Sequence, residues 1–92
     1  MERLSDEEID ERLVNGSWRR EGEAIVRDVE CADFAAAIAF VNAVAALAEQ
    51  ADHHPDVLVH GYKRVRLTLT THSAGGLTAR DFELADAIDA LG

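Results

Sequence analysis

An uncharged stretch of fifteen residues, Phe34–Ala48, most constrains how this chain can fold. It lies between Asp33 and Glu49 and is shorter than the roughly twenty residues that a membrane span needs. Its apolar residues recur at helical spacing in two stripes, which are Phe34, Ile38, Val41, Ala45 and Ala48, and Phe40, Val44 and Leu47. A helix that is apolar most of the way round is covered on more than one side. We therefore expect a helix over residues 33–51, and a second copy of the chain could provide the second cover.

The length and charge of the chain limit what it can bind. Its 92 residues make one domain, over residues 1–92, with little room for a deep cavity. The 18 acidic and 9 basic residues give a formal net charge of −9, which argues against direct contact with nucleic acid or an anionic membrane. Cys31 is the only cysteine and no signal peptide is visible, so we expect no disulfide and a cytoplasmic location.

Two capping signals predict the helices at either end of the chain. Ser5 and Glu8 can form a capping box that begins the first helix, and Asn15-Gly16 ends it. Thr78 and Asp81 form the same signal before the last helix.

Alternating apolar residues between turn signals predict four strands, namely Ser17–Arg20, Ala24–Glu30, Val57–His60 and Val65–His72. With the three helices, the order of elements is α-β-β-α-β-β-α. This order indicates an α+β fold, with an antiparallel sheet and helices packed on one face.

All four histidines lie between positions 53 and 72. His53 is at the C-terminal end of the long helix, where the partial negative charge of the helix end favours a protonated imidazole. His54 precedes Pro55, which favours extended backbone and ends the helix. His72 is at the end of the last predicted strand. A short hairpin separates these two ends, so the fold could bring His53 and His72 together as a proton-transfer site.

Other interpretations of these residues stay open. Histidines at a helix or strand end are often only caps or surface residues. Asp81 is as well explained as a capping residue as it is as a partner for His72, and Glu49 could orient a histidine or be solvated. Three imidazoles could bind zinc. However, adjacent residues in an extended chain point opposite ways, which argues against His53 and His54 sharing an ion.

Seven residues of the second half of the chain stand in a fixed order, namely Glu49, His53, His54, Pro55, Tyr62, His72 and Asp81. This arrangement resembles the pterin-4a-carbinolamine dehydratase family, and each spacing between them fits the family pattern. The resemblance extends from Glu49 to about Leu91. The N-terminal half agrees in element order and in Trp18. One departure is Val57, where many relatives have a large aromatic residue.

The resemblance implies a four-stranded antiparallel sheet with helices on one face, and it implies a reaction. Water is lost from a 4a-hydroxytetrahydropterin, such as 4a-hydroxytetrahydrobiopterin, to give the quinonoid dihydropterin. This hydro-lyase step belongs to tetrahydropterin recycling for aromatic amino-acid hydroxylases. It needs proton transfer but no metal, redox cofactor or covalent nucleophile, so we expect none.

The resemblance also implies roles for individual residues. His53 and His72 would be the general acids and bases at the leaving hydroxyl, and His54 would mainly bind and orient the pterin. The division of roles between His53 and His54 stays open.

Five further residues would support the site or bind substrate. Asp81 would bond an imidazole or the neighbouring backbone, and Glu49 and Pro55 would support the site from the helix end. Trp18 and Tyr62 would be pocket or packing aromatics.

Alternative functions also remain open. Members of the family act as dimerisation cofactors for a transcription factor, and the helix over 33–51 offers an apolar face for such a role. A different pterin, such as a molybdopterin-pathway intermediate, is another possible substrate. In each case we expect a homodimer or a homotetramer, since a 92-residue chain has a small core.

Overall fold

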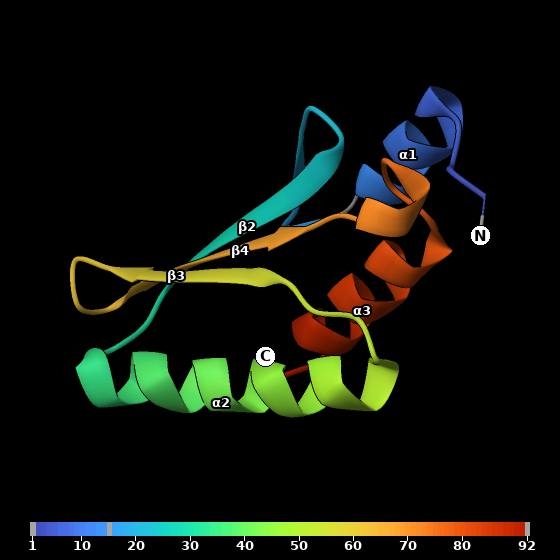
Figure 1. The fold of residues 1–92 in the computed structure, drawn as a ribbon. Coiled ribbons are helices and arrows are strands. Elements are labelled where there is room, and N and C mark those ends of the chain that lie inside the picture. Colours follow the sequence, from blue (N-terminus) through green and yellow to red (C-terminus); the bar gives the residue numbers. More distant parts are fainter. Residues whose placement is uncertain (1, 15, 92) are drawn as a thin grey trace.

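The computed structural model of the protein describes residues 2–14 and 16–91. Its elements are α1 (Asp6–Leu13), β1 (Arg19–Glu21), β2 (Ala24–Glu30), α2 (Phe34–Ala51), β3 (Asp56–His60), β4 (Arg64–Leu69), the single 3₁₀ turn η1 (His72–Ala74) and α3 (Ala79–Asp89). The strands form one antiparallel sheet in the order β1-β2-β4-β3. Helices α2 and α3 lie on one face of it (Figure 1). The predicted α+β fold and its order of elements are confirmed.

The core forms where the inward residues of the sheet meet the helices. In β4 the alternation is strict, because Val65, Leu67 and Leu69 are fully buried while the residues between them are partly exposed. Ile25 of β2 and Ile88 of α3 are equally buried in the same cluster. Alternation with a period of two therefore places one face of the sheet against the helices.

Both predicted capping boxes are present. The Ser5 hydroxyl accepts from the backbone N–H of Glu8, and the Glu8 carboxylate accepts from the backbone N–H of Ser5. Thr78 and Asp81 form the same arrangement at the start of α3. Helix α1 ends at Leu13. The predicted end at Asn15-Gly16 cannot be compared in full, since Asn15 lies outside the described residues.

Three of the four strands differ from their predicted bounds, and β3 differs only in beginning at Asp56 instead of Val57. β1 begins at Arg19 instead of Ser17, because Trp18 turns into the core and its indole N–H donates to the Asp89 carboxylate at 3.0 Å. β4 ends at Leu69 instead of His72. Thr71 pairs with Gly76 in an isolated bridge, which closes a short loop and places His72 on a 3₁₀ turn.

Helix α2 covers the sheet with a narrower face than predicted. Ala37, Val44 and Ala48 are buried, whereas Phe34 and Ile38 of the first predicted stripe are 55% and 37% exposed. One side of the helix faces the sheet and α3. In this chain the other side has no cover among the described residues.

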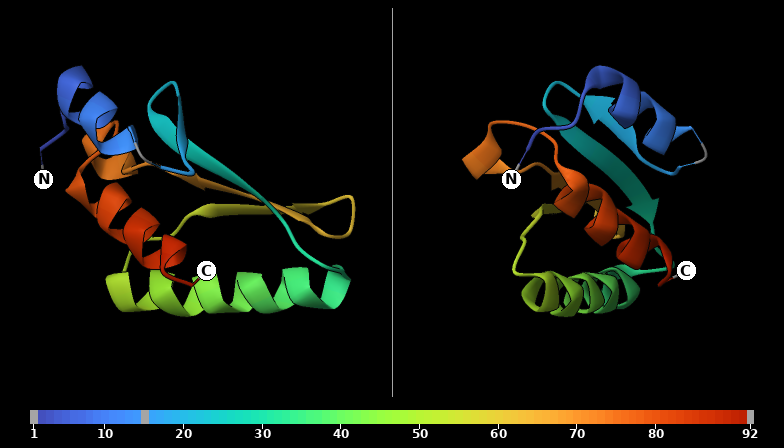
Figure 2. Two further views of the ribbon diagram at one scale, coloured as in Figure 1. Left: turned by 180° about the vertical axis from the view of Figure 1, so that it is seen from behind. Right: turned by 90° about the vertical axis from the view of Figure 1, so that its right-hand side faces the viewer.

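By length and composition alone, α2 could cross a membrane, since its 18 residues have a mean hydropathy of 1.6. The uncharged stretch Phe34–Ala48 is thus shorter than the helix, which continues to Ala51. Both ends of α2 lead through short loops into strands of the same sheet, and the helix lies along that sheet in two views (Figures 1 and 2). This placement is typical of a helix that covers a sheet.

The opposite face of the sheet carries charged side chains. Asp28 of β2 lies between Arg66 and Arg19, with oxygen–nitrogen distances of 2.8 Å to each. Hydrogen bonds from Arg66 and then from Arg19 lower the pKa of Asp28 to about 2. The helices and the candidate site described below lie on the other side.

Candidate functional site

Helix α2 ends in a left-handed turn that directs the following residues. Asp52 has φ 49° and ψ 44°, and its N–H donates to the Glu49 carbonyl at 3.2 Å. The N–H of His53 donates to the Ala48 carbonyl at 3.1 Å. These two bonds form a Schellman motif, which closes a helix and turns the chain away from its axis. The chain leaves α2 at His53 and continues through Pro55 into β3.

The side chain of His53 is buried against Asp81, the third residue of α3. The His53 Nε2 lies 2.5 Å from Asp81 Oδ1. The other oxygen of Asp81 accepts from the Thr71 hydroxyl at 2.8 Å and from the Thr78 backbone N–H at 3.0 Å. When Asp81 is ionised its carboxylate can only accept, so Nε2 of His53 is then the donor and its Nδ1 is left for other contacts.

The sequence left two interpretations of Asp81 open, and the structure has both at once. The carboxylate caps α3 through Oδ2 and holds an imidazole through Oδ1. That imidazole belongs to His53, whereas the sequence suggested His72. Asp81 is fully buried, so its charge and all its partners form one enclosed network.

His54 has a different environment. Its Nε2 contacts the Glu49 carboxylate, and both side chains are exposed. Glu49 thus lies in the last turn of α2, where it can orient a histidine. The two adjacent histidines are held by two different carboxylates, one on α3 and one on α2.

A polar recess of about 250 Å³ brings the three histidines together. It is lined by Asp52, His53, His54, Thr70, Thr71, His72, Ser73 and Arg80. Its walls come from the end of α2, from the segment after β4, and from the first turn of α3. His72 is exposed at its edge.

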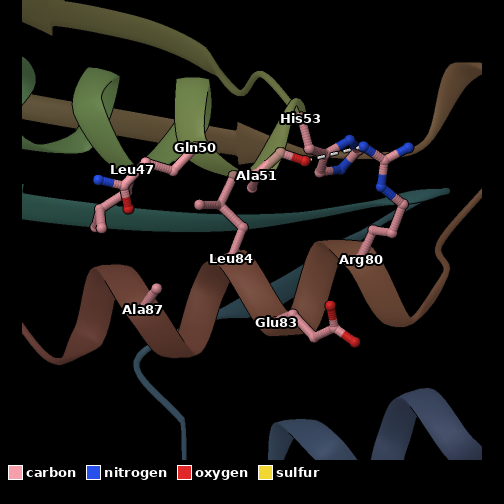
Figure 3. A pocket seen from close by; sticks show the side chains of 8 residues that line it. All are labelled: Leu47, Gln50, Ala51, His53, Arg80, Glu83, Leu84 and Ala87. Atoms are coloured by element: carbon pink, nitrogen blue, oxygen red, sulfur yellow. Dashed lines mark hydrogen bonds between the residues drawn. The ribbon is translucent and has the colours of Figure 1, made fainter.

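A second hollow of about 280 Å³ lies between α2 and α3 (Figure 3). Its lining is mostly apolar and comprises Leu47, Gln50, Ala51, His53, Arg80, Glu83, Leu84 and Ala87. His53 and Arg80 line both, so these two residues separate the hollow between α2 and α3 from the polar recess.

Three residues singled out in the sequence lie away from the recess. Trp18 is 6% exposed and packs in the core, which agrees with its interpretation as a packing aromatic. His60 and Tyr62 lie at the far end of β3, at the hairpin with β4 (Figure 1). Five strand residues at about 3.3 Å each carry the chain roughly 16 Å from Pro55. Pro55 lines a third hollow, which also includes His54 and residues of α2.

No group of three His, Cys, Asp or Glu side chains is arranged to hold a metal ion within residues 2–14 and 16–91. The Nε2 atoms of His53 and His54 each face a carboxylate. These contacts orient the two imidazoles.

Sequence reasoning missed two residues that build the site. Thr71 bonds both Asp81 and Thr78 from within the loop after β4. Arg80 reaches from α3 to the end of α2. One signal for Arg80 was available, because α2 has no basic residue in its last turn to interact with its terminal carbonyls.

Residues 2–91 match the family model described as pterin 4 alpha carbinolamine dehydratase. The chain belongs to this family. A Chloroflexus aurantiacus relative, provisionally named pterin-4-alpha-carbinolamine dehydratase, is 56% identical over 92 residues, which cover 99% of this chain and 98% of the relative. An Acidobacterium capsulatum relative with the same provisional name is 53% identical, with 99% of each chain covered.

Two solved structures of dehydratase-like proteins share the fold. One is described as a transcriptional coactivator/pterin dehydratase from Brucella melitensis, with a TM-score of 0.90, 37% identity and 97% of each chain covered. The other is described as a pterin dehydratase-like protein that is a RuBisCO assembly factor in the alpha-carboxysome. It has a TM-score of 0.68 and 29% identity, and covers 84% of this chain and 90% of its own. Proteins of this fold are thus described with more than one role.

Proposed function

We propose that this dehydratase-family protein converts 4a-hydroxytetrahydrobiopterin, or a close 4a-hydroxytetrahydropterin, to the quinonoid dihydropterin and water. The observation that carries the proposal is the buried pair of His53 and Asp81 beside His54 and His72 in one recess. The family membership supports the reaction class. The step would serve tetrahydropterin recycling in a pathway with an aromatic amino-acid hydroxylase.

The reaction requires two proton transfers. The 4a-hydroxyl accepts a proton and leaves as water, while a ring nitrogen supplies the electron pair that replaces the carbon–oxygen bond. Loss of a proton from a ring nitrogen then gives the neutral quinonoid product. We assign these transfers to His53, through Nδ1, and to His72, one as acid and the other as base. Positioned general acids and bases accelerate such steps by about 10²–10⁴-fold.

The surrounding residues would hold the acid, the base and the pterin in place. Asp81 keeps the Nε2 of His53 occupied, so that its other nitrogen faces the reaction. His54 would bind the pterin edge, with Glu49 fixing its ring. None of these steps calls for a metal or a redox cofactor.

The proposal predicts measurable dehydration by the purified protein. Freshly generated 4a-hydroxytetrahydrobiopterin is mixed with the protein, and formation of the quinonoid product is followed by absorbance. We expect a rate well above buffer, by about 10²-fold or more. His60→Ala is the matched control, since this histidine is exposed and outside the recess, and it should keep the full rate. A rate no faster than buffer would overturn the proposal.

We also propose that the protein is a homodimer or homotetramer associated through the exposed side of α2. Phe34 and Ile38 on α2 are exposed, as is Val57 on the adjacent edge strand β3. This part of α2 carries no charge before Glu49, so two copies with a net charge of −9 can meet there with little repulsion. A second copy is therefore the occupant that the surface suits.

Sedimentation at micromolar concentration tests this association. We expect a particle of at least twice the 10.0 kDa chain mass. Ile38→Glu should shift it to the monomer, because burying an unpaired carboxylate in an apolar interface is unfavourable. Val14→Glu is the matched control, because Val14 is an exposed apolar residue at the end of α1. This variant should sediment like the wild type. A 10 kDa wild-type monomer would contradict the proposal.

The same apolar face supports a second candidate function, that of an interaction module for another protein. Phe34 and Ile38 are the kind of exposed apolar residues that mark protein–protein interfaces. Two relatives are described with such roles. A His53→Ala variant that keeps its cellular function would favour the module over the enzyme.

A further inference from the structure

Arg80 connects α3 to the end of α2. Its Nη2 atom donates to the carbonyl oxygen of Ala51 at 3.1 Å (Figure 3). The same atom donates to the carbonyl oxygen of Asp52 at 2.5 Å. These are the last carbonyls before His53, and they lie where the helix carries its partial negative charge. A single cationic nitrogen thus holds the terminal backbone of α2.

The backbone that Arg80 holds is in an unfavourable conformation. Asp52 adopts the left-handed region, with φ 49°. Residues other than glycine pay a steric cost there and keep the conformation only when neighbours stabilise it. The peptide that carries the Asp52 carbonyl also carries the N–H of His53. A bond to this carbonyl therefore fixes the direction in which His53 leaves the helix.

The next residue of α3 holds the other end of the same histidine. Asp81 accepts from His53 Nε2, while Arg80 binds the carbonyl just before the His53 backbone. Two consecutive residues in the first turn of one helix thus hold the backbone and the ring of one imidazole. Arg80 also forms part of the wall of the recess.

We infer that Arg80 is a positioning residue that orients His53 through the backbone of α2. The inference rests on the proposed function only for its kinetic readout. Arg80 acts through the two carbonyls, so its contribution depends on a hydrogen-bond donor at the position of Nη2. Contact with the pterin is not required for this role.

A matched pair of variants tests the inference. Arg80→Met keeps much of the stem of the side chain and removes the donor, whereas Arg80→Lys restores one cationic nitrogen that can reach both carbonyls. We expect Arg80→Met to lower kcat by about 10²-fold, the cost of misplacing a catalytic group by about 1 Å. KM should stay within about threefold of the wild type, because substrate binding is not removed. Arg80→Lys should recover most of kcat.

A second readout is the imidazole of His53 itself. Ring nitrogen-15 spectra of the wild type should show the form with its proton on Nε2, as the bond to Asp81 requires. In Arg80→Met these signals should shift toward a mixture of forms, and in Arg80→Lys they should return. Arg66→Met is the control, since Arg66 pairs with Asp28 on the opposite face of the sheet and should change neither readout.

The outcomes separate this inference from the proposed function. A wild type without dehydratase activity would contradict the proposed function. The nitrogen-15 signals of the His53 ring would still test the positioning role. Unchanged kcat and unchanged signals in Arg80→Met would overturn the inference. A rise in KM alone would also overturn it, because Arg80 would then bind the substrate directly. If Arg80→Met does not fold, Arg80→Gln takes its place with the same expected results, because its shorter side chain places its donor short of both carbonyls.

Discussion

Replacing His53 or His72 with alanine is expected to slow the dehydration of 4a-hydroxytetrahydrobiopterin by about 10²–10⁴-fold, the usual contribution of a positioned acid or base. Each substitution removes one of the two groups to which we assign proton transfer. The rate is measured with each variant at the same protein concentration as the wild type. Two variants that both keep the full rate would show that the assignment is wrong.

The two variants should differ in stability. His72 is exposed, so His72→Ala should change the free energy of unfolding by less than about 0.5 kcal/mol. His53→Ala leaves one oxygen of the buried Asp81 without its partner, which costs about 1–3 kcal/mol. Urea unfolding of each variant separates loss of the catalytic group from loss of the fold. The control for activity is again His60→Ala.

Replacing Asp81 with alanine is expected to destabilise the fold strongly. The change removes the acceptor of three hydrogen bonds at once, those from the ring of His53, the hydroxyl of Thr71 and the N–H of Thr78. Removing one partner from a buried charged network costs about 3–5 kcal/mol. A domain of this size is stable by only about 5–14 kcal/mol. Urea unfolding should therefore show a much lower midpoint, and Asp86→Ala, on the exposed side of α3, should unfold like the wild type.

Asp81→Asn distinguishes the structural role of Asp81 from its role toward His53. The amide has nearly the same shape but offers only one acceptor oxygen, so it cannot accept both from His53 and from the Thr71–Thr78 side. We expect most of the stability to be kept. The dehydration rate should fall, because His53 would be held with its proton on Nδ1 instead of Nε2. An Asp81→Asn variant that is as active as the wild type would contradict the pairing with His53.

Most of the fold could be predicted because its signals are local. The capping boxes at Ser5 and Thr78 involve residues three apart, and both are present. β2 has the predicted bounds, and the helix predicted over 33–51 corresponds to α2. The errors arose where a tertiary contact overrode the local pattern. Trp18 left its strand for the core, and Thr71 paired with Gly76 and ended β4 early.

The site could be predicted in its members but less so in its contacts. The order and spacing of the residues from Glu49 to Asp81 pointed to the histidines that line the recess. The same pattern also included Tyr62, which β3 carries to the far end of the sheet. Arg80 was missed because its partners are backbone carbonyls, and the only local signal was the absence of a basic residue from the last turn of α2.

The sequence by itself determined which segments are helices and strands, which side of each strand is apolar, and which family pattern the chain carries. These properties depend on side-chain periodicity and on capping within a few residues. Only the tertiary structure decided that Asp81 holds His53 instead of His72. It also decided that Arg80 closes the end of α2 and that one side of α2 stays exposed. These contacts join residues about 28 positions apart, and they form only when α2 and α3 pack side by side on the same face of the sheet.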